Sequence, residues 1–407
     1  MDIAATVAPE DVGLSSRRLG RVNHWMEALV ASGKLAGLIT LVARHGELVH
    51  AECRGKMDVA ADKPMRPDTL FRIYSMTKPL TSAAIMMLYE EGRFQIDDPI
   101  TRFLPAFGDM RVYTSGMRQA YQTEPAARDI TFQDLLTHMS GLTYGFMEST
   151  PVDGMYRANN IDFSNAEAPL SEMMERLAKL PLLCQPGAEW NYSVSTDVLG
   201  ALVEVISGMP FDRFLQERII GPLGMTDTGF HVAEGQGHRL AANYMAGEGG
   251  KLTLIDDPKT SRFLKPRTLF SGGGGLVSSA RDYLRFADML RRKGEVDGIR
   301  LLGRKTVEYM TRNHLGGDMA ERGQPRFSES SYAGVGFGLG FSVMLDPAKA
   351  GVIGSPGEYA WGGAASTAFW VDPVEDMIVI LLTQLTPSST YPIRRELRVL
   401  TYQAIIE

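Results

Sequence analysis

The stretch Phe71-Arg72-Ile73-Tyr74-Ser75-Met76-Thr77-Lys78 decides how this chain is interpreted, because a helical pattern starts within it and runs to Glu91. Ser75 and Lys78 stand three residues apart in the first helical turn, so their side chains share one face. A serine hydroxyl becomes a good nucleophile when a neighbour takes its proton, and a partly desolvated lysine can do so. The N–H groups at a helix start also suit a developing oxyanion. Since S-x-x-K arises about once by chance in a chain of this length, the motif needs supporting residues.

A tyrosine further along the chain offers a partner for this pair. Trp190-Asn191-Tyr192-Ser193-Val194 lies between Pro186-Gly187 and a helical pattern that begins at Thr196. A nearby ammonium group is expected to lower the pKa of the Tyr192 phenol, which can then accept the Ser75 proton and return it to the leaving group. The alternative is a structural tyrosine whose ring packs and whose hydroxyl bonds a carbonyl. The sequence around Tyr192 leaves both open.

The third element is Trp361-Gly362-Gly363-Ala364, which leads into a predicted strand. Two glycines let a substrate lie close to the backbone, and the Ala364 N–H can complete an oxyanion hole with that of Ser75. A glycine bulge in an edge strand is the competing interpretation.

Taken in order, S-x-x-K, Y-S-x and x-G-G resemble the motifs of the serine β-lactamase and penicillin-binding-protein superfamily, on the class C β-lactamase side. The resemblance extends over about residues 14–400. It rests on further segments in the expected order, which are Asp97-Asp98-Pro99, Leu135-Leu136-Thr137-His138-Met139-Ser140-Gly141-Leu142, Pro222-Leu223-Gly224-Met225, Gly272-Gly273-Gly274-Gly275-Leu276 and Gly336-Phe337-Gly338-Leu339-Gly340.

This resemblance implies roles for named residues. Ser75 is the expected nucleophile, Lys78 its activating partner and Tyr192 the general acid and base, with the N–H groups of Ser75 and Ala364 as the oxyanion hole. It makes His138 structural, and it implies neither a cofactor nor a metal. The candidates for substrate contact are Trp361, Gly362, Gly363, Tyr144 and Asp197.

Two departures from the superfamily pattern bear on the substrate. The third motif usually begins with a Lys or His that binds a substrate carboxylate, whereas Trp361 is uncharged and would leave that anion unpaired. An Asn usually stands two residues after the tyrosine, whereas Val194 cannot hydrogen-bond a substrate amide. Tyr-Ser-Val with Trp-Gly-Gly is similar to the family VIII carboxylesterases and to fungal acyltransferases that acylate statin precursors.

The predicted activity is therefore hydrolysis of short- to medium-chain neutral carboxylic esters through an acyl-enzyme on Ser75. An acyltransferase or a promiscuous β-lactamase of the same fold is the first alternative. A catalytically silent binding or assembly homologue is the second. The chain contains no G-x-S-x-G, which argues against an α/β-hydrolase esterase.

The predicted fold is α/β plus all-α, with a β-lactamase-like antiparallel sheet flanked by helices. Residues 1–95 and 270–407 are expected to form a discontinuous α/β domain, and residues 96–269 a mainly helical insert with substrate-pocket loops. Strands are expected over 38–44, 47–53, 339–345, 366–371 and 377–383, and helices over 14–32, 75–91, 131–138, 171–180, 196–206, 211–220, 280–292 and 393–405.

Composition excludes some functions. The 407 residues carry a formal charge of −6 with no Lys/Arg cluster, which argues against nucleic acid as a partner. The N-terminus has neither a basic start nor an apolar run, and the longest apolar run, 377–382, is too short for a bilayer. We expect a cytoplasmic enzyme with a small-molecule ester as its partner and no membrane association. The sequence does not indicate an oligomeric state.

Overall fold

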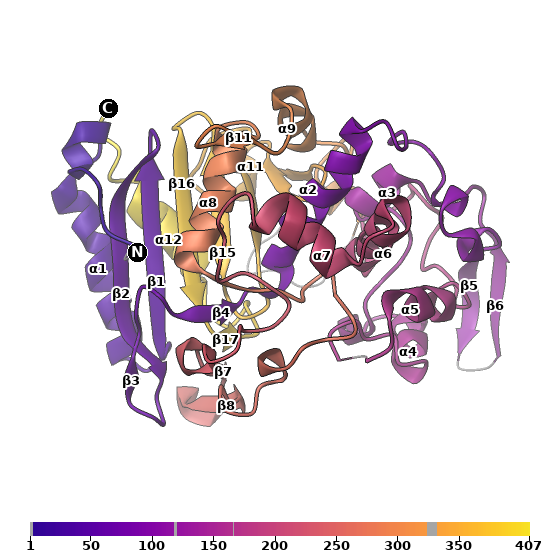
Figure 1. Ribbon diagram of the computed structural model, residues 1–407, viewed down its shortest axis with the longest axis horizontal. Coiled ribbons are helices and arrows are strands. Elements are labelled where there is room, and N and C mark those ends of the chain that lie inside the picture. Colours follow the sequence, from indigo (N-terminus) through magenta and orange to yellow (C-terminus); the bar gives the residue numbers. More distant parts are fainter. Residues whose placement is uncertain (1–2, 118–119, 166, 324–331) are drawn as a thin grey trace.

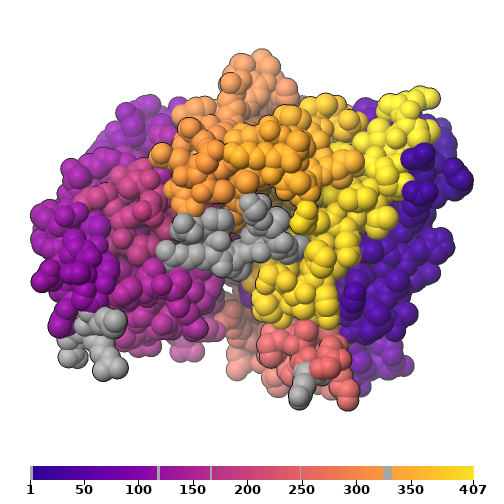
Figure 2. All heavy atoms as spheres, turned by 180° about the vertical axis from the view of Figure 1, so that it is seen from behind, coloured from indigo at the N-terminus to yellow at the C-terminus, as the bar shows by residue number. Residues whose placement is uncertain are grey.

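The computed structural model describes residues 3–117, 120–165, 167–323 and 332–407. A layered region with a large sheet lies beside a mainly helical region (Figure 1). The C-terminal residues lie against the N-terminal segment, as the yellow and indigo atoms of Figure 2 show, and the Ile406 N–H donates to the Gly13 carbonyl. No helix in these ranges is both long enough and apolar enough to cross a membrane.

Eight strands of the described chain form one sheet whose paired neighbours run antiparallel. The N-terminal strand β1 pairs with β16 on one side and with β2 on the other, so the two ends of the chain build the sheet together, as predicted. The strands in spatial order are β12 (Val335–Phe337), β13 (Ser342–Met344), β14 (Tyr359–Gly362), β15 (Ala368–Asp372), β16 (Met377–Thr383), β1 (Gly37–Arg44), β2 (Glu47–Asp58) and β3 (Lys63–Pro64).

Helices cover both faces of this sheet, which explains why β1 is buried along its whole length. Alternate residues of β1 enter different cores. Ile39 and Leu41 pack into the core that contains α2 (Thr77–Glu90) and α8 (Ala280–Arg291), whereas Leu38 and Val42 pack into the core that contains α1 (Ser16–Ala31) and α12 (Ile393–Tyr402). Helix α2 also packs against α6 (Ser195–Ser207) and so joins the sheet to the helical region.

The remaining elements complete the two regions. The other helices are α3 (Phe132–Leu136), α4 (Pro151–Ala158), α5 (Leu170–Leu177), α7 (Phe211–Leu215), α9 (Arg304–Met310), α10 (Met319–Arg322) and α11 (Pro347–Ala350). The smaller sheets pair β4 (Leu70–Arg72) with β9 (Val277–Ser279), β5 (Arg111–Met117) with β6 (Ala120–Pro125), β10 (Glu295–Val296) with β11 (Ile299–Arg300), and β7 (Asn243–Ala246) with both β8 (Leu252–Asp256) and β17 (Leu385–Thr386).

Several element boundaries differ from the sequence prediction for local reasons. The helix expected from Ser75 begins at Thr77, after a 3₁₀ turn over Tyr74–Met76. The strand expected over 339–345 is only β13, because Gly340 takes a positive φ of 101° and interrupts it. The strand expected from Ser366 begins at Ala368, since Ser366 has a φ of 67°. The polar hairpin β5–β6 was missed within the predicted helical insert. The division at 95/96 and 269/270 stays a prediction.

Candidate active site

The Ser75 turn is held in place from several sides. Strand β4 delivers the chain to this turn, and Arg72 at its end is fully buried and paired with Asp256 at 2.6 Å. The next residue but one, Tyr74, has a φ of 43°, a left-handed conformation that costs energy and needs surrounding support. Tyr283 of α8 supplies such support by donating from its hydroxyl to the Met76 carbonyl at 2.9 Å.

The structure brings Ser75, Lys78 and Tyr192 together, as the sequence predicted. The Lys78 Nζ lies 3.3 Å from the Ser75 Oγ, and the Tyr192 hydroxyl donates to the same Oγ at 2.6 Å. The Lys78 Nζ also lies 4.6 Å from the centre of the Tyr192 ring. A hydroxyl that has an amine on one side and a phenol on the other can lose its proton and later regain one.

Burial makes Lys78 a base near neutral pH. Its side chain is only 1% exposed, and desolvation lowers its pKa to about 7, against the opposing charge of Asp197. Two further acceptors hold the Lys78 Nζ, the Gly273 carbonyl at 2.7 Å and the Tyr144 hydroxyl at 3.0 Å. These contacts fix the direction of the amine. With a pKa of about 7, a large fraction of the protein molecules carry this amine uncharged at pH 7.

The expectation that the pKa of Tyr192 falls beside an ammonium group was wrong. Burial dominates and raises the pKa of Tyr192 above its usual value, although Ser75, the Trp361 indole and the charge of Arg394 act in the opposite direction. The ammonium charge that was to lower this pKa is itself suppressed by the burial of Lys78. Tyr192 thus enters the reaction as a protonated phenol.

Asp197 and Tyr144 lie beside Lys78 and not among the residues that line the main cavity. The Asp197 Oδ1 accepts from the Ser271 hydroxyl at 2.6 Å and from the Gly273 N–H at 3.1 Å, which turns the Gly273 carbonyl toward Lys78. A Cβ on Gly273 would stand 2.5 Å from the Asp197 carboxylate, so this position requires glycine. These contacts fit a role of both residues in orienting the lysine, and their contact with substrate stays a prediction.

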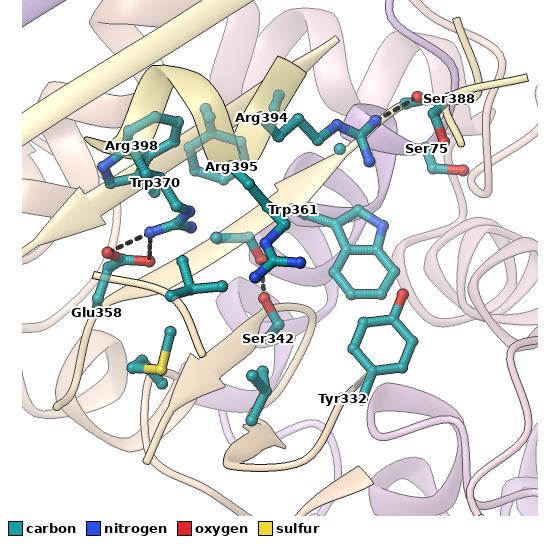
Figure 3. A pocket seen from close by; sticks show the side chains of 18 of the residues that line it. Ser75, Tyr332, Ser342, Glu358, Trp361, Trp370, Ser388, Arg394, Arg395 and Arg398 are labelled. Atoms are coloured by element: carbon teal, nitrogen blue, oxygen red, sulfur yellow. Dashed lines mark hydrogen bonds and ion pairs between the residues drawn. The ribbon is translucent and has the colours of Figure 1, made fainter. Parts of the chain in front are cut away.

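A cavity of about 170 Å³ opens at Ser75. Figure 3 shows Ser75 at one end of the cavity, with the Trp361 indole between it and the Tyr332 ring. The Trp361 ring lies 5.6 Å from that of Tyr192 and 5.2 Å from that of Phe337, centre to centre. Aromatic rings thus stand beside the nucleophile, and the side chains of Arg394, Arg395 and Arg398 line the same cavity.

The glycines of the third motif line the cavity together with Ser75, so their contact with substrate stays a prediction, and on the Cβ side they admit protein atoms. A Cβ on Gly362 would stand 2.7 Å from the Arg394 guanidinium, and one on Gly363 would stand 2.4 Å from the Ile73 carbonyl. Strand β14 therefore ends in direct backbone contact with the segment that leads to Ser75. The N–H of the next residue, Ala364, has no acceptor among the residues that the structure describes, and Ala364 lines the cavity together with Ser75.

His138 has the structural position that the resemblance implied. Its ring is buried at 5.0 Å from that of Tyr192, and burial holds its pKa well below the usual value. Its Nδ1 lies 3.1 Å from the Ser193 hydroxyl, so it supports the loop that carries Tyr192. In the described ranges, no three His, Cys, Asp or Glu side chains gather as a metal site would require.

Sequence reasoning missed the parts played by Ser271, Gly273 and Arg394. The run of four glycines from Gly272 was recognised as a family segment. Nothing in the local sequence indicates that the Gly273 carbonyl faces Lys78. Arg394 occupies an ordinary helical pattern and becomes noticeable only when α12 is placed against β14.

The sheet flanked by helices, with these three groups gathered at the start of α2, is the architecture of the β-lactamase-like serine hydrolases. A family model described as Beta-lactamase matches residues 22–403, and the chain belongs to this family.

Named relatives cover almost the whole chain. It is similar to Protein Rv1367c of Mycobacterium tuberculosis, with 38% identity over 88% of this chain and 87% of the relative. It is also similar to Esterase EstB of Burkholderia gladioli, with 32% identity over 93% and 94%. Among solved structures, EstCE1, a hydrolase with promiscuous acyltransferase activity, superimposes with a TM-score of 0.80 at 28% identity, over 95% of this chain and 99% of that one.

Proposed function

We propose that this protein is a serine carboxylic ester hydrolase that acts on short- to medium-chain neutral esters through an acyl-enzyme on Ser75. The observation that carries the proposal is the position of the Ser75 Oγ, between the Lys78 amine and the Tyr192 phenol at the end of a cavity. The similarity to EstB and EstCE1 supports ester hydrolysis. Membership of the family VIII carboxylesterases and a cytoplasmic location are parts of the same proposal.

The acylation step uses the two proton carriers in turn. Neutral Lys78 accepts the Ser75 proton while the Oγ bonds to the ester carbonyl carbon. The N–H groups of Ser75 and Ala364 stabilise the oxyanion of the tetrahedral intermediate. When the bond to the alcohol oxygen breaks, Tyr192 gives that oxygen its proton, which leaves an ammonium group beside a phenolate.

The deacylation step restores both groups. The Tyr192 phenolate takes a proton from a water molecule as the water oxygen bonds to the acyl carbon. The second tetrahedral intermediate then releases the Ser75 Oγ, which regains its proton from Lys78. Lys78 thus returns the Ser75 proton, and a proton from water replaces the one that Tyr192 gave to the alcohol. The net reaction consumes one ester and one water.

The surroundings of Ser75 favour uncharged substrates. Trp361 occupies the position at which relatives of the β-lactamase type carry a cation, and Val194 is buried in the main core. The Val194 side chain has no hydrogen-bonding group, and it is the Tyr144 hydroxyl that accepts from the Lys78 amine. The Trp361 side chain itself offers a carboxylate no positive charge, so a carboxylate held against the indole would lose its water without gaining an ion pair from this residue.

A panel of p-nitrophenyl esters of rising chain length, run together with one chromogenic cephalosporin, tests the proposed function. We expect turnover of acetate to octanoate esters and cephalosporin hydrolysis slower by at least about 10³-fold in kcat/KM, since Trp361 stands where β-lactamase-type relatives carry the cation that binds the substrate carboxylate. Comparable turnover of the cephalosporin would contradict the neutral-ester preference. No turnover of any ester would contradict the proposal itself.

Acyl transfer to an alcohol is a second candidate activity, and the name of EstCE1 favours it. The same acyl-enzyme passes its acyl group to an alcohol when the alcohol replaces water in the second step. The yield of methyl ester against free acid, measured as methanol is added to the p-nitrophenyl ester assay, gives the partition between the two acceptors.

The activity should follow the ionisation of Lys78. Because its amine must be uncharged to accept the Ser75 proton, and its pKa lies near 7, kcat/KM should rise with pH through about 7 and then level. Acidification below about pH 7 protonates the amine and should lower kcat/KM tenfold per pH unit. Measuring kcat/KM for one p-nitrophenyl ester from about pH 5 to about pH 9 checks this. An acid limb near the ordinary lysine pKa, about 10.4, would contradict it.

A further inference from the structure

The guanidinium of Arg394 covers the turn that joins β14 to β15. Its Nη2 donates to two carbonyls of this turn, that of Gly363 at 2.8 Å and that of Thr367 at 2.9 Å. The turn also carries Ala364, whose N–H faces no acceptor within the described residues. Figure 3 shows the Arg394 side chain extending from α12 along the cavity in the direction of Ser75.

The turn is built to receive this guanidinium. The missing Cβ of Gly362 leaves the space that the Arg394 Nη2 occupies, because a Cβ there would stand 2.7 Å from it. On its other side the turn touches the Ile73 carbonyl, two residues before Ser75. The turn is therefore enclosed between Arg394 and the segment that leads to Ser75. If the guanidinium shifts, we expect the turn to move with it, and the distance between the Ala364 and Ser75 N–H groups changes.

The turn requires support from outside. Its internal bonds are only two, from the Gly363 N–H to the Thr367 carbonyl at 2.9 Å and from the Ser366 N–H to the Gly363 carbonyl at 3.1 Å. Ser366 has a φ of 67°, which a non-glycine residue holds only when its surroundings impose it. Arg394 adds a bond to each of the same two carbonyls and so ties both ends of the turn to one rigid group.

We propose that Arg394 is a positioning residue, which holds the β14–β15 turn so that the Ala364 N–H stays directed at the oxyanion formed on Ser75. This inference rests on the proposed ester hydrolysis. An oxyanion hole acts through donors that are fixed before the reaction, so a loosened donor lowers the rate of the chemical step while ground-state binding changes little.

The test compares Arg394→Lys and Arg394→Gln with the wild-type protein on one p-nitrophenyl ester. Because both side chains are shorter than arginine and lack its planar, rigid guanidinium, neither can hold the two carbonyls in the same way. We therefore expect kcat to fall about 10- to 100-fold in both variants, with KM within about twofold. The affinity for a trifluoromethyl ketone, whose tetrahedral adduct needs the oxyanion hole, should weaken in parallel with kcat/KM. Affinity for the carboxylic acid product, which forms no tetrahedral adduct, should stay within about twofold.

Two further variants separate this role from general loss of structure. Arg18→Gln removes a guanidinium bond to the Gln403 carbonyl at the other end of α12 and should keep full activity. Gly362→Ala leaves Arg394 in the chain but crowds both its guanidinium, at 2.7 Å, and the Thr367 carbonyl of the same turn, at 2.8 Å, so it displaces the turn and should reproduce the fall in kcat even if an Arg394 variant fails to fold.

Each alternative result has a distinct meaning. Unchanged kcat in folded Arg394 variants, or a rise in KM with kcat intact, would overturn the positioning role, the second by showing that Arg394 binds substrate. A loss confined to esters that carry a carboxylate would overturn it in the same way. Failure of the proposed function would appear separately, as an absence of ester turnover in the wild-type protein.

Discussion

Replacing Ser75 with alanine should reduce kcat for p-nitrophenyl esters by at least about 10⁴-fold, because the variant has no oxygen to form the acyl-enzyme. The substitution removes one hydroxyl from a half-buried position whose neighbours, Lys78 and Tyr192, are held by other contacts. The site should therefore keep its shape and still bind ester. Steady-state kinetics, with intact-mass analysis after a fluorophosphonate is added, measure both consequences: lost turnover and no adduct.

Ser82→Ala is the matched control on the same helix. Ser82 lies one helical turn beyond Lys78 and is buried, and its hydroxyl has no partner among the described residues. Its removal should leave kcat unchanged and should not lower the melting temperature, since no bond is lost. Retention of more than about a tenth of the activity in Ser75→Ala would show that another group is the nucleophile.

The sheet could be predicted from the sequence because its central strands have strong local signals. The unbroken apolar run of β16 and the pair His45-Gly46, whose φ values of 54° and 86° suit a two-residue hairpin, locate three neighbouring strands. Strand β12 and hairpin β5–β6 lack such signals. β12 is only three residues long, and the residues described in β6 are largely exposed, so tertiary contacts decide their structure.

The site was predictable in its residue types and not in its electrostatics. Motif order identified Ser75, Lys78 and Tyr192, yet the directions of their pKa shifts depend on how deeply each group is buried. Sequence reasoning expected a partly desolvated lysine, but for Tyr192 it considered only the attraction between an ammonium and a phenolate. In the structure desolvation outweighs that attraction, lowers the pKa of Lys78 and raises that of Tyr192, which favours Lys78 as the first base and Tyr192 as the acid.

The glycines illustrate the same limit. Gly363 was expected to make room for a substrate, and its Cβ position is taken by the Ile73 carbonyl and the Thr367 hydroxyl, while its backbone lines the cavity. The glycine itself was visible in the sequence. One of the two atoms that require it belongs to Ile73, 290 positions earlier in the chain, and only the folded structure identifies that contact.

Replacing Tyr192 with phenylalanine should leave the ring in place and remove both later proton transfers. The ring contacts with His138 and Trp361 persist, so KM should change little, whereas kcat should fall about 10³-fold. Tyr144→Phe, which removes one of three contacts of the Lys78 Nζ, should cost about tenfold or less. Tyr113→Phe, which loses a bond to the Gly116 carbonyl in the β5–β6 hairpin, is the control and should keep full activity.

The leaving group separates the two roles of Tyr192. Because p-nitrophenolate departs without a proton, Tyr192→Phe should still be acylated by a p-nitrophenyl ester and should release one equivalent of p-nitrophenol in a burst, followed by slow turnover. Intact-mass analysis should then find the acyl group on Ser75. An alkyl ester of the same acid needs the phenol proton to leave, so it should give neither burst nor adduct. If the p-nitrophenyl ester also gives no burst while Lys78 is intact, then Tyr192, not Lys78, accepts the Ser75 proton, and the order of proton transfers proposed above is wrong.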